Sequence, residues 1–302
     1  MLKSGLEAVL TPSPAVFIIG ILIVVLLPIL LHVVLSSTTD ASLPYVLLAG
    51  PSGAGKTALL TLFERGPQSK TEKPAATLTH TSQIPATIEL AVSEDAQSSF
   101  RDDLDASGAT AKSFLLVDTP GHPKLRQHAL SRLAVSTTKK GPAAGKLKGV
   151  VFIVDAAALA DGDSLPATAE YLYDILLSLQ KRMSGNKTSR PPAGIPVLVA
   201  ANKLDLFTSL PAALVKTNLE TELTRIRKAR SKGLLDSGVG ADDDGLSGAD
   251  ASDDWLGEYG SEKFAFKQML EFDIEVEVKG GNVVGDGPGV DGWWSWVAQC
   301  IV

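Results

Sequence analysis

The feature that most constrains the fold is the segment Gly50–Thr57 (GPSGAGKT), which matches the pattern G-x-x-x-x-G-K-[ST]. It lies between an apolar run, Tyr45–Ala49, and a stretch with helical spacing, Ala58–Arg65. Glycines in such a loop let successive backbone N–H groups surround phosphate oxygens, and the following helix adds the positive end of its dipole. The segment therefore predicts a nucleoside triphosphate site in which Lys56 reaches the β- and γ-phosphates and Thr57 ligates Mg²⁺. The residues expected to contact the nucleotide here are Gly50, Ser52, Gly53, Ala54, Gly55, Lys56, Thr57 and Ala58.

Apolar runs and stretches of helical spacing alternate along the chain after this loop. Because continuous apolar strands separated by helices are typical of covered parallel sheets, we expect an α/β fold, with a mostly parallel central sheet flanked by helices. The expected strands are Tyr45–Ala49, Phe114–Val117, Val150–Val154 and Val197–Ala200, with Ile84–Val92 as an edge strand. The expected helices are Ala58–Arg65, Leu125–Val135, Ala169–Gln180 and Leu210–Lys228. The residues expected to share the core face of a last helix are Trp293, Trp296, Val297, Cys300 and Ile301.

A second motif, Asp118-Thr119-Pro120-Gly121-His122, follows the second of these expected strands. In a parallel sheet, ligands bind beyond the carboxyl ends of the strands, so this motif is expected beside the Gly50–Thr57 loop. Asp118 is suited to hold Mg²⁺, directly or through water, and the Gly121 N–H to meet a γ-phosphate. A simple turn that closes the strand is the alternative interpretation.

A third motif, Asn202-Lys203-Leu204-Asp205, follows the strand Val197–Ala200. The Asp205 carboxylate can accept from N1–H and the 2-amino group of guanine, a pattern that adenine does not offer. Asn202 can meet the opposite edge of the purine, and the stem of Lys203 can lie over the ring. The three motifs in this order predict a guanine-nucleotide switch domain, and they disfavour an ATPase.

The N-terminal segment Ala15–Leu35 is apolar throughout, and the chain carries no Asp, Glu, Lys or Arg between Glu7 and Asp40. A helix needs about 20 apolar residues to cross a bilayer, so we interpret this segment as a transmembrane helix. A buried core helix and a cleaved signal peptide are the alternatives, and both fit the length and flanks less well. The positive-inside rule, resting on Lys3, weakly favours a cytosolic N-terminus, but the need for cytosolic GTP favours the opposite orientation.

An acidic tract near the C-terminal third carries nine Asp and Glu residues between Asp236 and Glu262, with no Lys or Arg among them. Its Gly, Ser and Ala content predicts a flexible insertion at about residues 233–262. The formal net charge of −6 argues against direct sequence-specific nucleic-acid binding. Basic stretches around Lys146 and Arg227 are interpreted as dipole complements at a helix end, with anionic lipid or ribosomal RNA as alternative partners.

The motifs GPSGAGKT, DTPGH and NKLD resemble those of the Ras-like and Arf-like small GTPases. Together with the apolar span and the pieces YLYDILLS, LETELTRIRKARS and Phe264-Ala265-Phe266, the chain is identified as a member of the signal recognition particle receptor beta subunit family. The resemblance implies an organisation of residues 1–14 as a lumenal tail, 15–35 as a transmembrane helix, 36–42 as a linker and 43–302 as the GTPase domain.

The same resemblance implies a function at the endoplasmic reticulum membrane, with the GTPase domain cytosolic. GTP and Mg²⁺ are the implied cofactors, and the receptor alpha subunit is the implied partner through the switch regions, with the ribosome or translocon as further partners. His122 stands where relatives carry the Gln that orients water, so it is the candidate catalytic residue for slow GTP hydrolysis. A surface position without a catalytic role is the alternative for His122.

Two departures from the family pattern affect expected contacts. For the switch I ligand of Mg²⁺ we favour Thr81, with Thr79 second, because Thr77, Thr79 and Thr81 crowd the same region. The segment Val276–Gly281 lacks the usual Ser-Ala pair that holds the guanine oxygen. Rival functions are an Arf/Sar-like trafficking GTPase, disfavoured because Leu2 excludes N-myristoylation, and a GTP-binding scaffold that does not hydrolyse.

Overall fold

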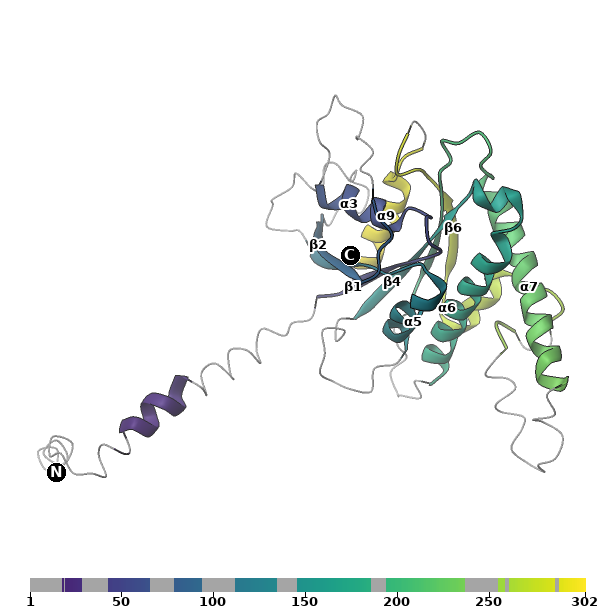
Figure 1. Cartoon of the computed structure of the whole chain (residues 1–302). Helices are drawn as coiled ribbons and strands as arrows, with labels where there is room; N and C mark the ends of the chain where they lie inside the picture. Colours follow the sequence, from purple (N-terminus) through teal and green to yellow (C-terminus); the bar gives the residue numbers. More distant parts are fainter. Residues whose placement is uncertain are drawn as a thin grey trace, which may run out of the picture. The chain divides into compact units, whose positions relative to one another are not determined.

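The computed structural model describes residues 18, 20–28, 43–65, 79–93, 112–134, 146–185, 194–236, 255–258, 261–285 and 288–302 (Figure 1). The chain divides into two compact units, residues 1–42 and 43–302. In the first unit, residues 18 and 20–28 are helical and exposed, and the rest of the predicted span lies outside the described residues. Among the described residues, no helix has both the length and the apolar character needed to cross a membrane.

The second unit contains a six-stranded sheet in the order β2-β3-β1-β4-β5-β6. All neighbouring strands are parallel except the edge pair, in which β2 runs antiparallel to β3. The strands are β1 (Tyr45–Ala49), β2 (Ala86–Val92), β3 (Lys112–Asp118), β4 (Leu147–Asp155), β5 (Val197–Asn202) and β6 (Val276–Gly280). The central strands are buried almost throughout, whereas β2 alternates, and this difference confirms the predicted edge position of the segment near Ile84–Val92.

Helices cover both faces of the sheet (Figure 1). The longer ones are α3 (Lys56–Arg65), α5 (Gln127–Leu133), α6 (Leu165–Gly185), α7 (Ala212–Asp236) and α9 (Asp291–Ile301). Short 3-10 turns are η1 (Pro123–Leu125), η2 (Ala158–Asp161) and η3 (Phe266–Phe272). The helix predicted over Leu125–Val135 is therefore broken into η1 and a shorter α5. Pro123 at the first turn of η1 favours this start, because proline lacks an N–H and has its φ fixed.

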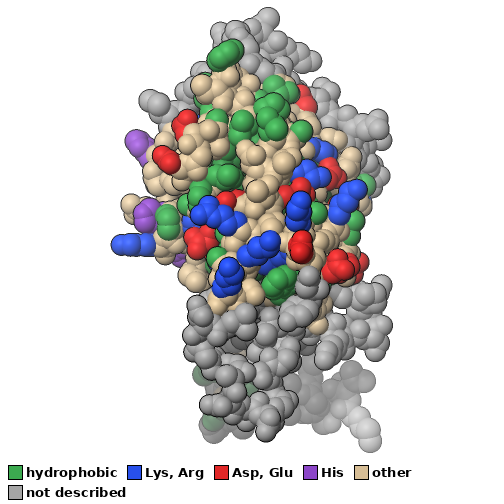
Figure 2. Space-filling view, turned by 90° about the vertical axis from the view of Figure 1, so that its right-hand side faces the viewer, with side chains coloured by type: hydrophobic (Ala, Val, Ile, Leu, Met, Phe, Trp, Pro, Cys, Tyr) green, Lys and Arg blue, Asp and Glu red, His purple; other side chains and the backbone are tan. Residues whose placement is uncertain are grey.

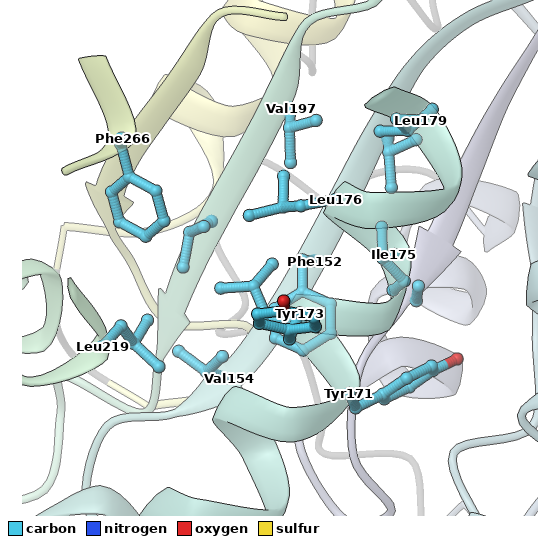
Figure 3. Close-up of a cluster of buried hydrophobic side chains, with 14 of the residues drawn as sticks. Phe152, Val154, Tyr171, Tyr173, Ile175, Leu176, Leu179, Val197, Leu219 and Phe266 are labelled. Carbon is cyan, nitrogen blue, oxygen red and sulfur yellow. The ribbon is translucent and has the colours of Figure 1, made fainter. Parts of the chain in front are cut away.

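Each face of the sheet has its own core. On one face, Phe152 of β4 and Val197 of β5 pack against Tyr171, Leu176 and other residues of α6 (Figure 3). On the other face, α3 and α9 cover the sheet, and the buried ring of Trp294 meets Phe63 edge-on with 5.0 Å between ring centroids. The second core explains why Trp294 is as buried as the predicted Trp293 and Trp296: α3 and α9 both lie on this face of the sheet, and the Trp294 ring packs between Phe63 of α3 and Phe114 of β3.

The end of the acidic segment is held against α6 and α7. Trp255–Glu258 fall inside the region predicted as a flexible insertion, and the Leu256 side chain is buried. The Arg227 guanidinium lies 4.6 Å from the Trp255 ring centroid and donates to the carbonyls of Leu256 (3.1 Å) and Ser261 (2.6 Å). Gln180 adds hydrogen bonds to the backbone of Trp255 and Gly257. Arg227 is therefore a buried anchor, which the interpretation as a dipole complement missed.

Candidate functional site

The loop between β1 and α3 has a backbone that only glycine tolerates at its key positions. Gly50, Gly53 and Gly55 have φ values of 135°, 79° and 103°. A Cβ on Gly50 would strike the Ile153 carbonyl, and one on Gly55 would strike the Asn202 side chain. The glycines therefore let the loop lie against the ends of β4 and β5, with the N-terminus of α3 behind it. Such a cradle of backbone N–H groups suits phosphate oxygens.

The Lys56 ammonium lies across the loop, and its Nζ donates to the carbonyls of Gly50 (2.9 Å) and Pro51 (2.7 Å). Burial lowers the pKa of Lys56 to about 8, while the charge of Asp118 opposes the change. An anion beside this ammonium would offset the cost of burying it, so the site favours a phosphate ligand.

Thr57 and Asp118 meet at the end of the loop, where the Thr57 hydroxyl donates to Asp118 Oδ2 at 2.7 Å. Burial raises the pKa of Asp118, and the bond from Thr57 and the charge of Lys56 act against that shift. The other carboxylate oxygen, Asp118 Oδ1, is buried and has no hydrogen-bond partner among the described residues. A hydroxyl and a carboxylate with an unsatisfied oxygen form a donor set that suits Mg²⁺, directly or through water.

Gly121 brings the DTPGH segment against the phosphate loop. A Cβ on this residue would lie 2.5 Å from Lys56 Nζ and 2.6 Å from the Gly50 carbonyl oxygen. The next residue, His122, is exposed, and its Nδ1 accepts from the Lys124 N–H at 3.3 Å as a cap on η1. The structure thus brings Gly121 to the phosphate loop, whereas the His122 imidazole serves as a turn cap at the surface.

The start of α5 is fastened to α6 through Arg126. Its guanidinium donates to the Ala167 carbonyl (3.1 Å), lies 3.7 Å from the Glu170 carboxylate and stacks 4.7 Å from the Tyr171 ring centroid. On the other side of the site, Thr79 and Thr81 are exposed on the segment that precedes β2, and Thr77 lies outside the described residues. Neither described threonine is brought to the Thr57–Asp118 pair by a hydrogen bond.

Asn202, at the end of β5, connects three loops. Its side-chain nitrogen donates to the Ala54 carbonyl (2.7 Å), and its oxygen accepts from the N–H groups of Lys203 (2.8 Å) and Val283 (3.1 Å). These bonds tie the phosphate loop to the loop after β6. The predicted link from Asn202 back to the phosphate loop is thus present in the structure.

Lys203 adopts a positive φ of 67°, and its ammonium forms an ion pair with Asp155 Oδ2. The other oxygen of Asp155 accepts from the backbone N–H groups of Ala157 and Ala158, each at 3.0 Å. Asp155 therefore holds Lys203 in place at the expected guanine position. The sequence analysis did not predict a role for Asp155, because the expected strand Val150–Val154 ends one residue before it. The signal was present, since Asp118 was identified as an Asp that follows an apolar strand, and Asp155 does the same.

The loop after β6 stands where the missing Ser-Ala pair was expected. The Gly281 N–H donates to the Ala201 carbonyl (2.9 Å), and the buried Asn282 organises the turn through bonds to Val284, Gly285 and Gly289. Gly285 lies so close to the exposed Asp205 that a Cβ there would be 2.7 Å from the carboxylate. This loop, built on glycine and asparagine residues, offers backbone groups beside Asp205, and the sequence analysis did not identify Asn282.

Comparison with known families and sequences gives consistent matches. The sequence model of the signal recognition particle receptor beta subunit matches residues 41–271. The signal recognition particle receptor subunit beta of Saccharomyces cerevisiae is 35% identical over 191 residues, and that of Homo sapiens is 30% identical over 190 residues. The matched regions are 63% and 62% of this chain, and they span 61% of the yeast relative and 58% of the human relative.

Solved structures extend the match over most of the chain. The signal recognition particle receptor SRb-GTP/SRX complex from Chaetomium thermophilum is 49% identical, with a TM-score of 0.69, over 85% of this chain and 99% of that chain. The SRb-GDP-Mg structure from the same organism is 48% identical, with a TM-score of 0.61, over 87% of this chain and 100% of that chain. The six-stranded sheet and its helices thus form an α/β small-GTPase fold.

Proposed function

The chain belongs to the signal recognition particle receptor beta subunit family, and from this premise we propose that it is a GTP-binding, membrane-anchored subunit that tethers the receptor alpha subunit. The observation that carries the proposal is the Asn202 side chain, which joins the phosphate loop, the NKLD segment and the loop after β6. It links three separate segments of the chain into the site that we propose for the guanine nucleotide. The relatives whose solved structures contain GTP, or GDP with Mg²⁺, support the same assignment.

In the proposed site, the phosphates lie on the backbone of Gly50–Thr57 and against Lys56. The bonds from Lys56 Nζ to Gly50 and Pro51 are given up in exchange for bonds to charged phosphate oxygens, which are stronger acceptors. Thr57 and Asp118 hold Mg²⁺, which neutralises charge on the phosphates when it is bound. Asp205 and the loop around Asn282 select guanine, and Asp155 keeps Lys203 over the base.

We expect hydrolysis to be slow without a partner. The His122 imidazole is exposed and accepts from Lys124, so it has to leave this cap before it can orient a water molecule. Arg126, which follows the DTPGH segment at the start of α5, is held on Tyr171 and Ala167 of α6. The site is therefore built to bind GTP, and a partner that moves these groups would be required for rapid turnover.

The surface proposed for the alpha subunit is the switch region, consisting of the exposed segment His122–Lys124 and the segment around Thr81. Gly121 packs directly on the phosphate loop, so a γ-phosphate near Lys56 changes the position that this segment can take. Binding of the alpha subunit is thereby coupled to GTP. The complex of a relative with SRX supports this choice of partner.

The proposed anchor is the apolar segment 15–35, with residues 1–14 in the lumen of the endoplasmic reticulum and residues 43–302 in the cytosol. Retention of the full chain in membranes after carbonate extraction tests the anchor. Protease protection in sealed vesicles tests the orientation. If the domain that contains Gly50 were protected from the protease inside sealed vesicles, the proposed orientation would be reversed.

The central test is nucleotide-dependent co-purification from detergent-solubilised membranes. Wild-type chain with GTP is expected to retain the alpha subunit, identified by mass, and chain with GDP is expected to lose it. Lys56→Ala is expected to behave like the GDP sample, whereas Lys267→Ala, an exposed lysine on η3, serves as the matched control. Equal recovery in every sample would contradict GTP-dependent tethering, and competition by ATP as strong as by GTP would contradict guanine selection.

A further inference from the structure

The chain enters the second unit at the edge of the sheet opposite the nucleotide site. Leu43 and Pro44 precede β1, and the Pro44 carbonyl accepts from the Leu115 N–H of β3 at 2.9 Å. On the other side, the Tyr45 N–H donates to the Lys146 carbonyl just before β4, at 3.0 Å. The entry point thus lies between the first residues of two neighbouring parallel strands, at the amino edge of the sheet.

In the described parts of the chain nearest this entry point, the surrounding elements carry basic side chains and neither Asp nor Glu. Neither Asp nor Glu occurs in the described segments 43–46, 112–115, 127–134, 146–150, 176–185 and 297–302, which approach the edge from β1, β3, α5, β4, α6 and α9. The same segments contain six basic residues, which we call the basic rim: Lys112, Arg132, Lys146, Lys148, Lys181 and Arg182.

Hydrogen bonds fix parts of the rim close to the chain entry. The Tyr45 hydroxyl donates to the Arg132 carbonyl (3.1 Å), and Arg182 donates to the Leu133 carbonyl (3.2 Å). Burial raises the pKa of Tyr45, and the positive charges of Arg182 and Arg132 act against that shift, as expected for guanidinium groups near this hydroxyl. On β3, Lys112 donates to the backbone carbonyl of Val302 (3.0 Å).

Other charged surfaces of the unit are mixed. The part of the same edge near β6 is acidic, with Glu271, Asp273, Glu275 and Glu277. On the face of α6 and α7 in Figure 2, basic and acidic side chains alternate, and Arg230 lies 2.9 Å from Asp174 and 3.8 Å from Glu170. Among the described residues, segments that carry Lys or Arg and no Asp or Glu therefore gather at the half of the edge where the chain enters.

We propose that the basic rim binds the anionic headgroups of the membrane in which residues 15–35 are anchored. This inference rests on the proposed anchor. The seven residues 36–42 can span at most about 25 Å, so the entry point at Leu43 cannot move far from the bilayer surface. This reach lets the basic rim come within a Debye length of the headgroups, about 8–10 Å at physiological salt, where anionic lipid attracts it. Each Lys or Arg near the headgroups then raises the equilibrium constant of the contact about fivefold. The rim thereby orients the domain, so that the nucleotide site at the opposite edge faces away from the membrane.

The test uses the full chain in lipid nanodiscs that contain dansyl-labelled lipid, with energy transfer from the tryptophans of the second unit as the readout. Discs contain either phosphatidylcholine alone or phosphatidylcholine with phosphatidylserine. Wild-type transfer is expected to be higher with phosphatidylserine. The difference should vanish at about 1 M salt, where the Debye length falls to about 3 Å.

The diagnostic variant combines Lys112→Gln, Lys146→Gln and Lys148→Gln, which leaves the two rim arginines and their structural bonds intact. Removing three charges lowers the equilibrium constant of the lipid contact by about a hundredfold, so the phosphatidylserine-dependent transfer is expected to be lost. The control removes three lysines elsewhere, through Lys216→Gln, Lys263→Gln and Lys267→Gln, and should behave as wild type.

Two further measurements separate this inference from the proposed function. Binding of fluorescent GTP to the same discs reports the nucleotide site, and carbonate extraction reports the anchor, so each can fail independently of the lipid contact. Transfer that is equal in both lipids, or that persists in the rim variant, would overturn the lipid contact. RNA can be added to the discs that hold the wild-type chain. If RNA binds the basic rim and abolishes the phosphatidylserine-dependent transfer, the rim is a nucleic-acid site, and the proposed lipid contact is overturned.

Discussion

Replacement of Asn202 by Ala is the sharpest perturbation of the site, because this one side chain holds three backbone groups from separate loops. The variant removes the bond to the Ala54 carbonyl (2.7 Å) and the bonds from the N–H groups of Lys203 (2.8 Å) and Val283 (3.1 Å). Ala54 and Val283 are buried, so water does not readily replace the lost partner at either group.

The size of the effect follows from these two buried groups. A buried donor or acceptor left without a partner costs about 1–3 kcal/mol, so the variant should lose about 2–6 kcal/mol of unfolding free energy. For a domain of this size, each kcal/mol lowers Tm by about 2–4 °C, so a decrease of roughly 4–24 °C is expected. GTP affinity should also fall by at least about tenfold. In the proposed site the phosphate loop and the loop after β6 both contact the nucleotide, and loss of about 1.4 kcal/mol of binding free energy corresponds to a factor of ten in affinity.

The assay is thermal unfolding of the full chain in mild detergent, followed by tryptophan fluorescence with and without GTP and Mg²⁺. Asn218→Ala on α7 is the matched control, because it removes an amide of the same size that lies outside this network. A Tm within about 2 °C of wild type would refute the argument, since it would mean that the two buried groups find partners elsewhere. If GTP raised the Tm of the variant by as much as it raises that of the wild type, the argument that Asn202 couples the two loops to nucleotide binding would be refuted.

Three further predictions concern single side chains. Asp155→Asn keeps an acceptor for Ala157 and Ala158 but loses the Lys203 ion pair, so stopped-flow release of GDP and GTP should both accelerate, by at most about tenfold because the pair is partly exposed. Gly121→Ala places a Cβ 2.6 Å from the Gly50 carbonyl oxygen, so equilibrium titration should find a greater loss of affinity for GTP than for GDP; equal losses would contradict a contact with the γ-phosphate. Burial, with the charge of Glu277, raises the pKa of Cys300 to about 12. Alkylation of Cys300 at pH 8 should therefore be roughly a thousandfold slower than that of a free thiol, and its rate should rise tenfold per pH unit. Fast labelling of the folded protein at pH 8 would refute the raised pKa.

The expected strands and the positions of the three motifs at strand ends follow from local patterns. Apolar runs such as Val197–Ala200 identify a buried strand without knowledge of its neighbours, and the residues that follow such runs lie at the carboxyl edge of a parallel sheet. The sequence therefore places Lys56, Asp118 and Asn202 at one edge. Strand order and the antiparallel direction of β2 are not contained in any local pattern, because they depend on which strands pair.

The contacts that hold the site together likewise do not follow from any local pattern in the sequence. Asn202 and Ala54 are separated by 148 positions in the chain, and Lys203 and Asp155 by 48, so no spacing rule indicates either pair. Arg227 is another example: in sequence it belongs to a basic helix end, whereas in the structure it is buried against Trp255 and holds the end of the acidic tract.

The sequence by itself determined the class of fold, the phosphate loop and the choice of guanine, because each depends on residues within a few positions of one another. Only the tertiary structure decided what positions Lys203, how Asn282 organises the loop after β6, and that basic residues from four segments gather where the chain enters. These features depend on how distant segments pack, since the backbone groups and charges concerned meet only after the sheet has formed and its two faces are covered.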